Sequence, residues 1–317
     1  MGCATARVLA RLGHDVTMYE QFEVGHTRGS SHGRTRIYRY SYPEERYVGL
    51  MKEALGLWRE LETESGATIL QQTGGLDMGK NLDAHVAAFD AHAIPYEVLD
   101  THDVSKRWPS LSLPDGDVLF QADGGVVHAA KAWNAFAAGA TAAGVTVERR
   151  RVAELPAEGL PGFDVTVVTA GGWAKALLAT AGIELDVKPT RETVVYFKTD
   201  DLPPTLVDWG DPAVYALHDP VHGLKAGEHI AGPETDPDGT GAPDAGSVDR
   251  LKDWVAARYR SVDPQPVGAE TCIYTNTDDE HFELARHGAI VLGSACSGHG
   301  FKFSPLIGRR LADLATS

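Results

Sequence analysis

The sequence is poor in cysteine and in positive charge, and it contains no long apolar run. Its three cysteines, Cys3, Cys272 and Cys296, cannot form a disulfide framework, and the lack of a Cys-x-x-Cys pair argues against a zinc site. The 13 histidines show no metal-binding spacing, so we expect no metal. With 29 Lys+Arg against 44 Asp+Glu, the net charge of −15 argues against nucleic acid or an anionic membrane as a partner. No run of 18 apolar residues and no signal peptide are found, so we expect a reduced cytoplasmic setting.

The first twenty residues resemble half of a nucleotide-binding unit. Residues 2–12 predict a helix capped by Gly13, and residues 16–19 predict a strand that ends at Glu20. In a dinucleotide-binding βαβ unit, an acidic residue at this place bonds the ribose hydroxyls. Gly2 stands at the third glycine of GxGxxG, and the first strand would lie before Met1. We favour a start upstream of Met1 over a fold that tolerates losing a central strand, and an ordinary helix–strand pair is the alternative.

The order of predicted elements indicates two interleaved domains in one mixed α/β fold. Nucleotide-type strands and helices occur at the start, middle and end of the chain, and antiparallel-looking segments lie between them. We predict a Rossmann-like dinucleotide-binding domain that lacks its first strand, interleaved with an antiparallel-sheet substrate domain, and a pocket at their junction. The first domain takes residues 1–75, 128–186 and 275–317, and the second takes residues 76–127 and 187–274.

The stretch 293-GSACSGHGFKFSP-305 predicts an anion-recognising loop between a strand and a helix. Residues 289–292 predict a short buried parallel strand, Ser304 is a candidate N-cap, and Pro305 suits the first helical position. Gly298 and Gly300 let backbone N–H groups approach a ligand, and Lys302 adds a full positive charge there.

Three further stretches carry candidate site residues. The segment 29-GSSHGRTRIYR-39 places Arg36 and Arg39 around apolar residues, and arginine binds carboxylates and phosphates bidentately. Lys225 alternates with small and apolar residues on a predicted strand, and Cys272 lies in 270-ETCIYTNTDDEHF-282. Each also has an ordinary interpretation, namely a solvated basic loop, an outward-facing lysine and a thiol that packs in the core.

Taken together, GSSHGRTRIYR, KRWP (106–109), GLKAGEH (223–229), CIYTNTDDEHF and SGHGFKFSP resemble the monomeric sarcosine oxidase and N-methyltryptophan oxidase family of D-amino-acid-oxidase-like flavoproteins. The resemblance implies that the dinucleotide is FAD and that FAD is attached through a thioether to Cys272, with Cys296 as the rival thiol. It also implies a monomeric enzyme. The implied cofactor-binding residues are Gly2, Glu20, Ser31, His32, Thr35, Cys272, Gly298, His299 and Gly300.

The same resemblance implies roles at the substrate. Arg39 and Lys302 would hold the substrate carboxylate, and Tyr215 would line the pocket. Lys225 would lie under the flavin and promote its reaction with oxygen, because a cation favours electron transfer to neutral oxygen. Arg36 would lie near the reactive part of the flavin ring, and His229 would line the substrate pocket.

The implied reaction is oxidation of an N-methyl amino acid by hydride transfer to the flavin. Water would hydrolyse the imine to formaldehyde and the amino acid, and oxygen would be reduced to hydrogen peroxide. Two alternatives stay open. One is a related flavin oxidase acting on a cyclic imino acid or another secondary amine, and the other is an N-terminally truncated, non-catalytic fragment. A nicotinamide dehydrogenase would leave Cys272 and Lys302 unexplained.

Overall fold

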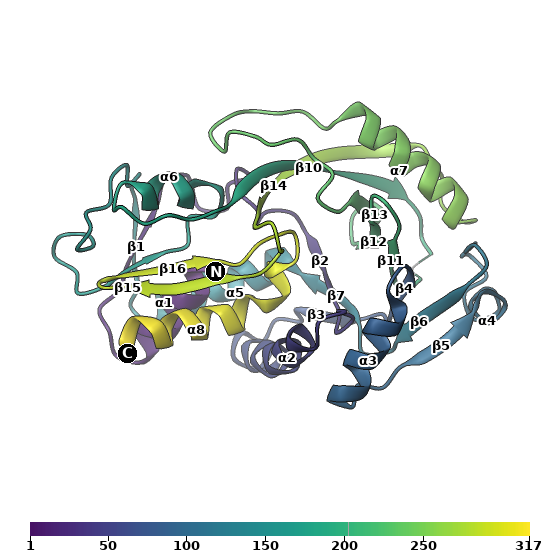
Figure 1. The fold of residues 1–317 in the computed structure, drawn as a ribbon, viewed down its shortest axis with the longest axis horizontal. Coiled ribbons are helices and arrows are strands. Elements are labelled where there is room, and N and C mark those ends of the chain that lie inside the picture. The colour runs from purple at the N-terminus through teal and green to yellow at the C-terminus, as the bar shows by residue number, and fades with distance from the viewer. Residues whose placement is uncertain (202) are drawn as a thin grey trace.

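A large, mainly antiparallel sheet and three small sheets make up the fold in the computed structural model, which describes residues 1–201 and 203–317 (Figure 1). The helices are α1 (Gly2–Arg11), α2 (Glu45–Ser65), α3 (Leu82–His92), α4 (Thr101–Arg107), α5 (Ala129–Ala142), α6 (Ala174–Ala179), α7 (Ala245–Arg258) and α8 (Ser304–Thr316), with 3₁₀ turns η1 (Gly171–Trp173) and η2 (Gly300–Phe303). The strands are β1 (Thr17–Glu20), β2 (Thr35–Tyr38), β3 (Leu70–Gln72), β4 (Gly75–Gly79), β5 (Glu97–Asp100), β6 (Asp117–Gln121), β7 (Gly125–His128), β8 (Thr146–Arg149), β9 (Thr166–Val168), β10 (Lys188–Lys198), β11 (Thr205–Trp209), β12 (Val214–Asp219), β13 (Gly223–Glu228), β14 (Pro266–Asn276), β15 (Glu283–His287) and β16 (Ile290–Ser294). The predicted mixed α/β class is confirmed.

The large sheet has eight strands in the order β14-β10-β13-β12-β11-β4-β6-β5. All neighbours are antiparallel except β11 and β4, which run parallel. Helix α7 packs against this sheet through Leu251 and Val255, whose side chains are fully buried among Val195, Phe197 and Ala226. Figure 1 shows β10 and β14 reaching from this sheet toward the end of the molecule that carries β1 and β16.

The strands predicted for the nucleotide-binding half form small sheets. Strand β1 pairs parallel with β8, and β9 pairs parallel with β16, which pairs antiparallel with β15. Strands β1 and β9 therefore lie in separate sheets. Helix α1 packs closely on α8, where a Cβ at Gly308 would lie 2.7 Å from the Cβ of Ala4. Small residues in both helices allow this approach.

One local prediction about helix α8 is wrong. Ser304 is the first residue of α8, whose N-cap is Phe303, and the Ser304 hydroxyl donates back to the carbonyl of Phe301 at 2.5 Å. The preceding residues already turn as η2, so the helix begins from a 3₁₀ turn and no side-chain oxygen caps its N–H groups. Lys302 lies in that 3₁₀ turn, so contacts that hold the turn also hold the backbone of Lys302.

Trp58 on helix α2 makes such a contact with the turn. The indole ring is fully buried, packs against Phe136 and Phe301, and donates its N–H to the carbonyl of Lys302 at 2.7 Å. The core of this half of the molecule thus fixes the backbone of the lysine that the sequence singles out. Within residues 1–201 and 203–317, no helix has the length and apolar character needed to cross a bilayer.

Candidate active site

One cavity of about 1600 Å³ lies between the small sheets and the large sheet. Its lining comes from α1, β1, the segment 29–44, the strands β12 to β14, and the loop that leads into α8. Every residue that the sequence nominates lies on this wall, namely Gly2, Glu20, Ser31, His32, Thr35, Arg36, Arg39, Tyr215, Lys225, His229, Cys272, Gly298, His299, Gly300 and Lys302. Residues far apart in the chain therefore meet at a single site, and their individual roles remain predictions.

Arg39 and Lys302 converge on the ring of Tyr42. The Lys302 ammonium donates to the Tyr42 hydroxyl at 2.9 Å and to the carbonyl of His299 at 3.2 Å. The Arg39 guanidinium lies 4.6 Å from the centroid of the same ring and 4.9 Å from that of Trp209. Two cations thus share one aromatic partner on the cavity wall, which is a favourable place for an anionic ligand.

The charge of this pair is only partly compensated. Arg39 is 8% exposed, and its Nη1 atom lies 3.8 Å from the Asp77 carboxylate without a hydrogen-bond partner. Burial, and then the neighbouring Arg39, hold the pKa of Lys302 well below its ordinary value. A bound carboxylate would supply the missing hydrogen bonds and would favour the charged form of the lysine. The pair can therefore act as a carboxylate clamp.

Lys225 and Arg36 form a second cationic group in the cavity. Strand β13 presents Lys225, whose ammonium is buried and lies 3.5 Å from the carbonyl of Thr35. Burial first, and Arg36 second, lower the pKa of Lys225 to about 8. Arg36 is held by the carbonyls of Thr35, Ser30 and His32 at 2.8, 2.8 and 2.6 Å. Lys225 is thus mostly charged at neutral pH but close to its titration range.

Two thiols line the cavity. Burial raises the pKa of Cys272 to about 11, while the charges of Arg36 and Lys225 act in the opposite direction. Cys296 accepts a hydrogen bond from the backbone N–H of Thr275 at 3.3 Å, so its loop lies beside β14. Because both thiols face one cavity, the geometry leaves Cys296 open as the rival attachment point.

Two tyrosines form an aromatic wall of the cavity. Tyr215 on β12 and Tyr274 on β14 are adjacent, and burial raises the pKa of both phenols. Gly298 has a φ of +72°, and a Cβ there would overlap the Tyr274 ring, so this position requires glycine. The ring of His229 lies 6.1 Å from that of Tyr274 and its Nε2 lies 3.0 Å from the Glu280 carboxylate.

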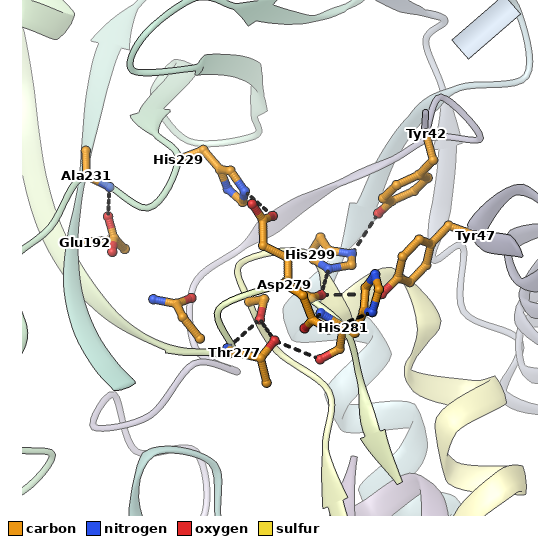
Figure 2. Close-up of polar contacts among 12 residues, drawn as sticks. Tyr42, Tyr47, Glu192, His229, Ala231, Thr277, Asp279, His281 and His299 are labelled. Atoms are coloured by element: carbon orange, nitrogen blue, oxygen red, sulfur yellow. Dashed lines mark hydrogen bonds and ion pairs between the residues drawn. The ribbon is translucent and has the colours of Figure 1, made fainter. Parts of the chain in front are cut away.

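A histidine–carboxylate network borders the cavity beside this wall. Figure 2 shows the Tyr42 hydroxyl facing the His299 ring, at 3.2 Å from Nδ1. The other ring nitrogen of His299 lies 2.9 Å from the carbonyl of Glu280, and burial keeps the pKa of His299 well below its usual range. His281 lies between Asp279 and the carboxylate of Glu44, at 2.9 and 3.1 Å. The turn 279–281 is therefore tied to both the clamp and His229.

The wall suits a dinucleotide as well as a small anion. The imidazole Nε2 of His32 and the hydroxyl of Thr35 are buried without a hydrogen-bond partner, and burial lowers the pKa of His32 to about 4. A Cβ at Gly2 would lie 2.9 Å from the Thr169 hydroxyl, and a Cβ at Gly300 would overlap the Ala295 carbonyl. These glycines bring backbone close to the cavity, and the orphaned polar atoms need a polar ligand. The residues present therefore fit FAD.

Sequence reasoning missed three residues of the site. Tyr42 joins the two cations, Asp77 on β4 balances Arg39 and accepts from the Trp209 indole at 3.0 Å, and Glu280 binds His229. Asp77 alone carried a usable signal, because an acidic residue inside the apolar stretch Leu76–Met78 indicates a buried partner.

Comparison with known proteins shows that the chain is similar to FAD-dependent oxidoreductases along nearly its whole length. A family model described as DAO, FAD dependent oxidoreductase, matches residues 1–314. Human peroxisomal sarcosine oxidase is 33% identical and aligns with 99% of this chain and 89% of the human protein. Monomeric sarcosine oxidase of Bacillus sp. (strain NS-129) is 31% identical over 100% and 90% of the two chains. The open form of NikD, an unusual amino acid oxidase essential for nikkomycin biosynthesis, has a TM-score of 0.88 at 26% identity over 99% and 91% of the chains.

Proposed function

The chain belongs to the DAO family of FAD-dependent oxidoreductases, and on that basis we propose that it oxidises a small N-methyl amino acid with oxygen as acceptor. The observation that carries the proposal is the convergence of Arg39 and Lys302 on Tyr42, in the same cavity as Lys225. A carboxylate clamp beside a flavin site is what an amino acid oxidase requires. The sarcosine oxidases among its relatives point to the same substrate class.

The side chains have separable tasks in this proposal. Arg39 and Lys302 bind the substrate carboxylate and so fix the direction of the amine. Tyr215 and Tyr274 line the same cavity and would limit the access of water to the amine. A neutral amine would need no strong base. Bound FAD supplies the hydride acceptor. Lys225 places a positive charge where negative charge develops when oxygen is reduced.

Three finer points belong to the proposal. Cys272 forms the thioether to FAD, the products are formaldehyde, the demethylated amino acid and hydrogen peroxide, and the enzyme acts as a cytoplasmic monomer. The domain boundaries given above also remain predictions. A cyclic imino acid is the second candidate substrate, because the carboxylate clamp serves both substrates equally and the aromatic wall would accept a ring.

The test is peroxide release by the FAD-loaded chain. Sarcosine, N-methyltryptophan and pipecolate are compared as substrates, and formaldehyde is measured in parallel. Peroxide with equimolar formaldehyde supports N-methyl oxidation, while peroxide from pipecolate alone supports the cyclic alternative. Bound FAD without turnover of any secondary amine would contradict the proposal and favour a non-catalytic chain.

A further inference from the structure

A buried carboxylate behind the cavity wall ties down the turn that follows His229. Glu192 on β10 is 1% exposed, and its Oε2 atom accepts from the backbone N–H groups of Ala231 and Gly232 at 3.1 and 2.9 Å. The Thr190 hydroxyl donates to its other oxygen. These neutral donors compensate the burial of the carboxylate, and none of them belongs to the candidate active site.

The turn that Glu192 binds is strained. Ile230 has a φ of +52°, which a β-branched residue adopts only at a cost of about 1–3 kcal/mol. Such a conformation persists when hydrogen bonds hold the backbone both before and after the strained residue. The N–H of His229 is held by the Ala213 carbonyl at 2.8 Å, and the two bonds to Glu192 hold the far side. Gly232 also packs directly on the backbone of Arg191.

We propose that Glu192 is a positioning residue for the reaction, because it fixes the turn 229–232 and thereby the place of His229 on the cavity wall. Figure 2 shows Glu192 bound to the Ala231 N–H. The His229 ring lies with its Nε2 atom 3.0 Å from the Glu280 carboxylate. Without Glu192, two adjacent backbone N–H groups lose their acceptor and the strained Ile230 loses its restraint. His229 would then leave its contact with Glu280. The role of His229 at the substrate rests on the proposed function.

The experiment compares Glu192→Gln and Glu192→Ala in the FAD-loaded full chain. A glutamine oxygen can accept both N–H groups, so hydrogen exchange at Ala231 and Gly232 should stay slow in Glu192→Gln. In Glu192→Ala we expect exchange at both amides to become at least about tenfold faster. The KM for the N-methyl amino acid should rise about tenfold while kcat changes less than about threefold.

Glu62 provides a matched control. Its carboxylate accepts from two consecutive backbone N–H groups, of Ile69 and Leu70, at 2.7 and 2.8 Å, and it lies outside the cavity. Glu62→Ala should lower the thermal midpoint as Glu192→Ala does, while KM and the exchange of the Ala231 amide stay unchanged. If Glu192→Ala behaves as Glu62→Ala in all three measurements, Glu192 has only a structural role and the inference is overturned.

A double-mutant cycle separates an effect through His229 from a general one. In a His229→Ala background, Glu192→Ala should raise KM less than about twofold further, because the group that it positions is already gone. Additive effects on KM would overturn the inference. Amide exchange reports on the turn whether or not the chain oxidises an N-methyl amino acid. Failure of the proposed function would leave the exchange pattern intact, whereas failure of this inference would change it.

Discussion

Replacing Lys302 with methionine should weaken the binding of a substrate-like carboxylate. Two of the three ammonium protons are used, by the Tyr42 hydroxyl at 2.9 Å and the His299 carbonyl at 3.2 Å, which leaves the third for a ligand. A hydrogen bond to a charged group contributes about 1.5–3 kcal/mol, so Lys302→Met should raise the Kd about 10- to 150-fold. Methoxyacetate is a suitable probe, because an ether replaces the oxidisable amine.

The pH dependence of carboxylate binding follows from the lowered pKa of Lys302. Burial and Arg39 favour the neutral amine in the free site, whereas a bound carboxylate favours the ammonium. As the pH rises through the pKa of the free site, binding must take up a proton, and affinity should fall by up to about tenfold per pH unit. Below that pKa the lysine is already charged and affinity should be flat.

Titration calorimetry in buffers of different ionisation enthalpy measures both the Kd of methoxyacetate and the number of protons taken up on binding. We expect proton uptake in the unaltered chain and none in Lys302→Met. The affinity of Lys302→Met for methoxyacetate should not change with pH where that of the unaltered chain falls. Lys52→Met is the control, since the Lys52 ammonium is exposed and bonds the carbonyl of His92. Equal Kd values for Lys302→Met and the unaltered chain, or proton uptake that survives the substitution, would refute the role of Lys302 as a carboxylate ligand.

Three further predictions concern other parts of the site. Cys272→Ala should release flavin from the acid-precipitated protein, and colour that stays in the pellet would favour Cys296 as the attachment point. Because the pKa of Lys225 is about 8, the ammonium fraction falls about tenfold from pH 7 to pH 9, and the rate of flavin reoxidation by oxygen should fall with it. In Lys225→Met, stopped-flow measurements should show slow reoxidation at a rate that does not change with pH. Trp58→Phe removes the bond to the Lys302 carbonyl and should lower the free energy of unfolding by about 1–3 kcal/mol in urea, whereas an unchanged midpoint would contradict that bond.

Local patterns in the sequence predicted much of the fold. Helix α1 with Gly13 beyond its end, and strand β1 ending at Glu20, follow from apolar spacing and one glycine. Motifs that resemble a known family predicted which residues meet in the cavity, because the resemblance implies how distant motifs are arranged around one cofactor. The Ser304 cap failed for a physical reason, since the 3₁₀ turn at Gly300–Phe303 already turned the chain into the helix.

Residues that act on the site through distant partners could not be predicted. Glu192 is adjacent in sequence to nothing in the site, and it meets Ala231 only because β10 and β13 are neighbours in the sheet. Glu280 likewise binds a partner more than thirty residues away, His229. Asp77 could be expected to have a buried partner, but the sequence does not show that this partner is Arg39. A single sequence carries no signal for such pairs, because a carboxylate on a loop or a strand has many possible partners.

The buried charged residues of the cavity wall are basic in the described part of the chain, although the chain as a whole is acidic. The net charge of −15 lies mostly in solvated side chains, which water and salt screen. Lys225, Arg39 and Lys302 are buried and line the cavity, so water and salt screen their charges far less than those at the surface. Because burial lowers the pKa of both lysines, charging them inside the fold costs free energy, and a bound anion would offset part of that cost. Part of the binding energy of a carboxylate would therefore come from compensating cations that the fold has already buried.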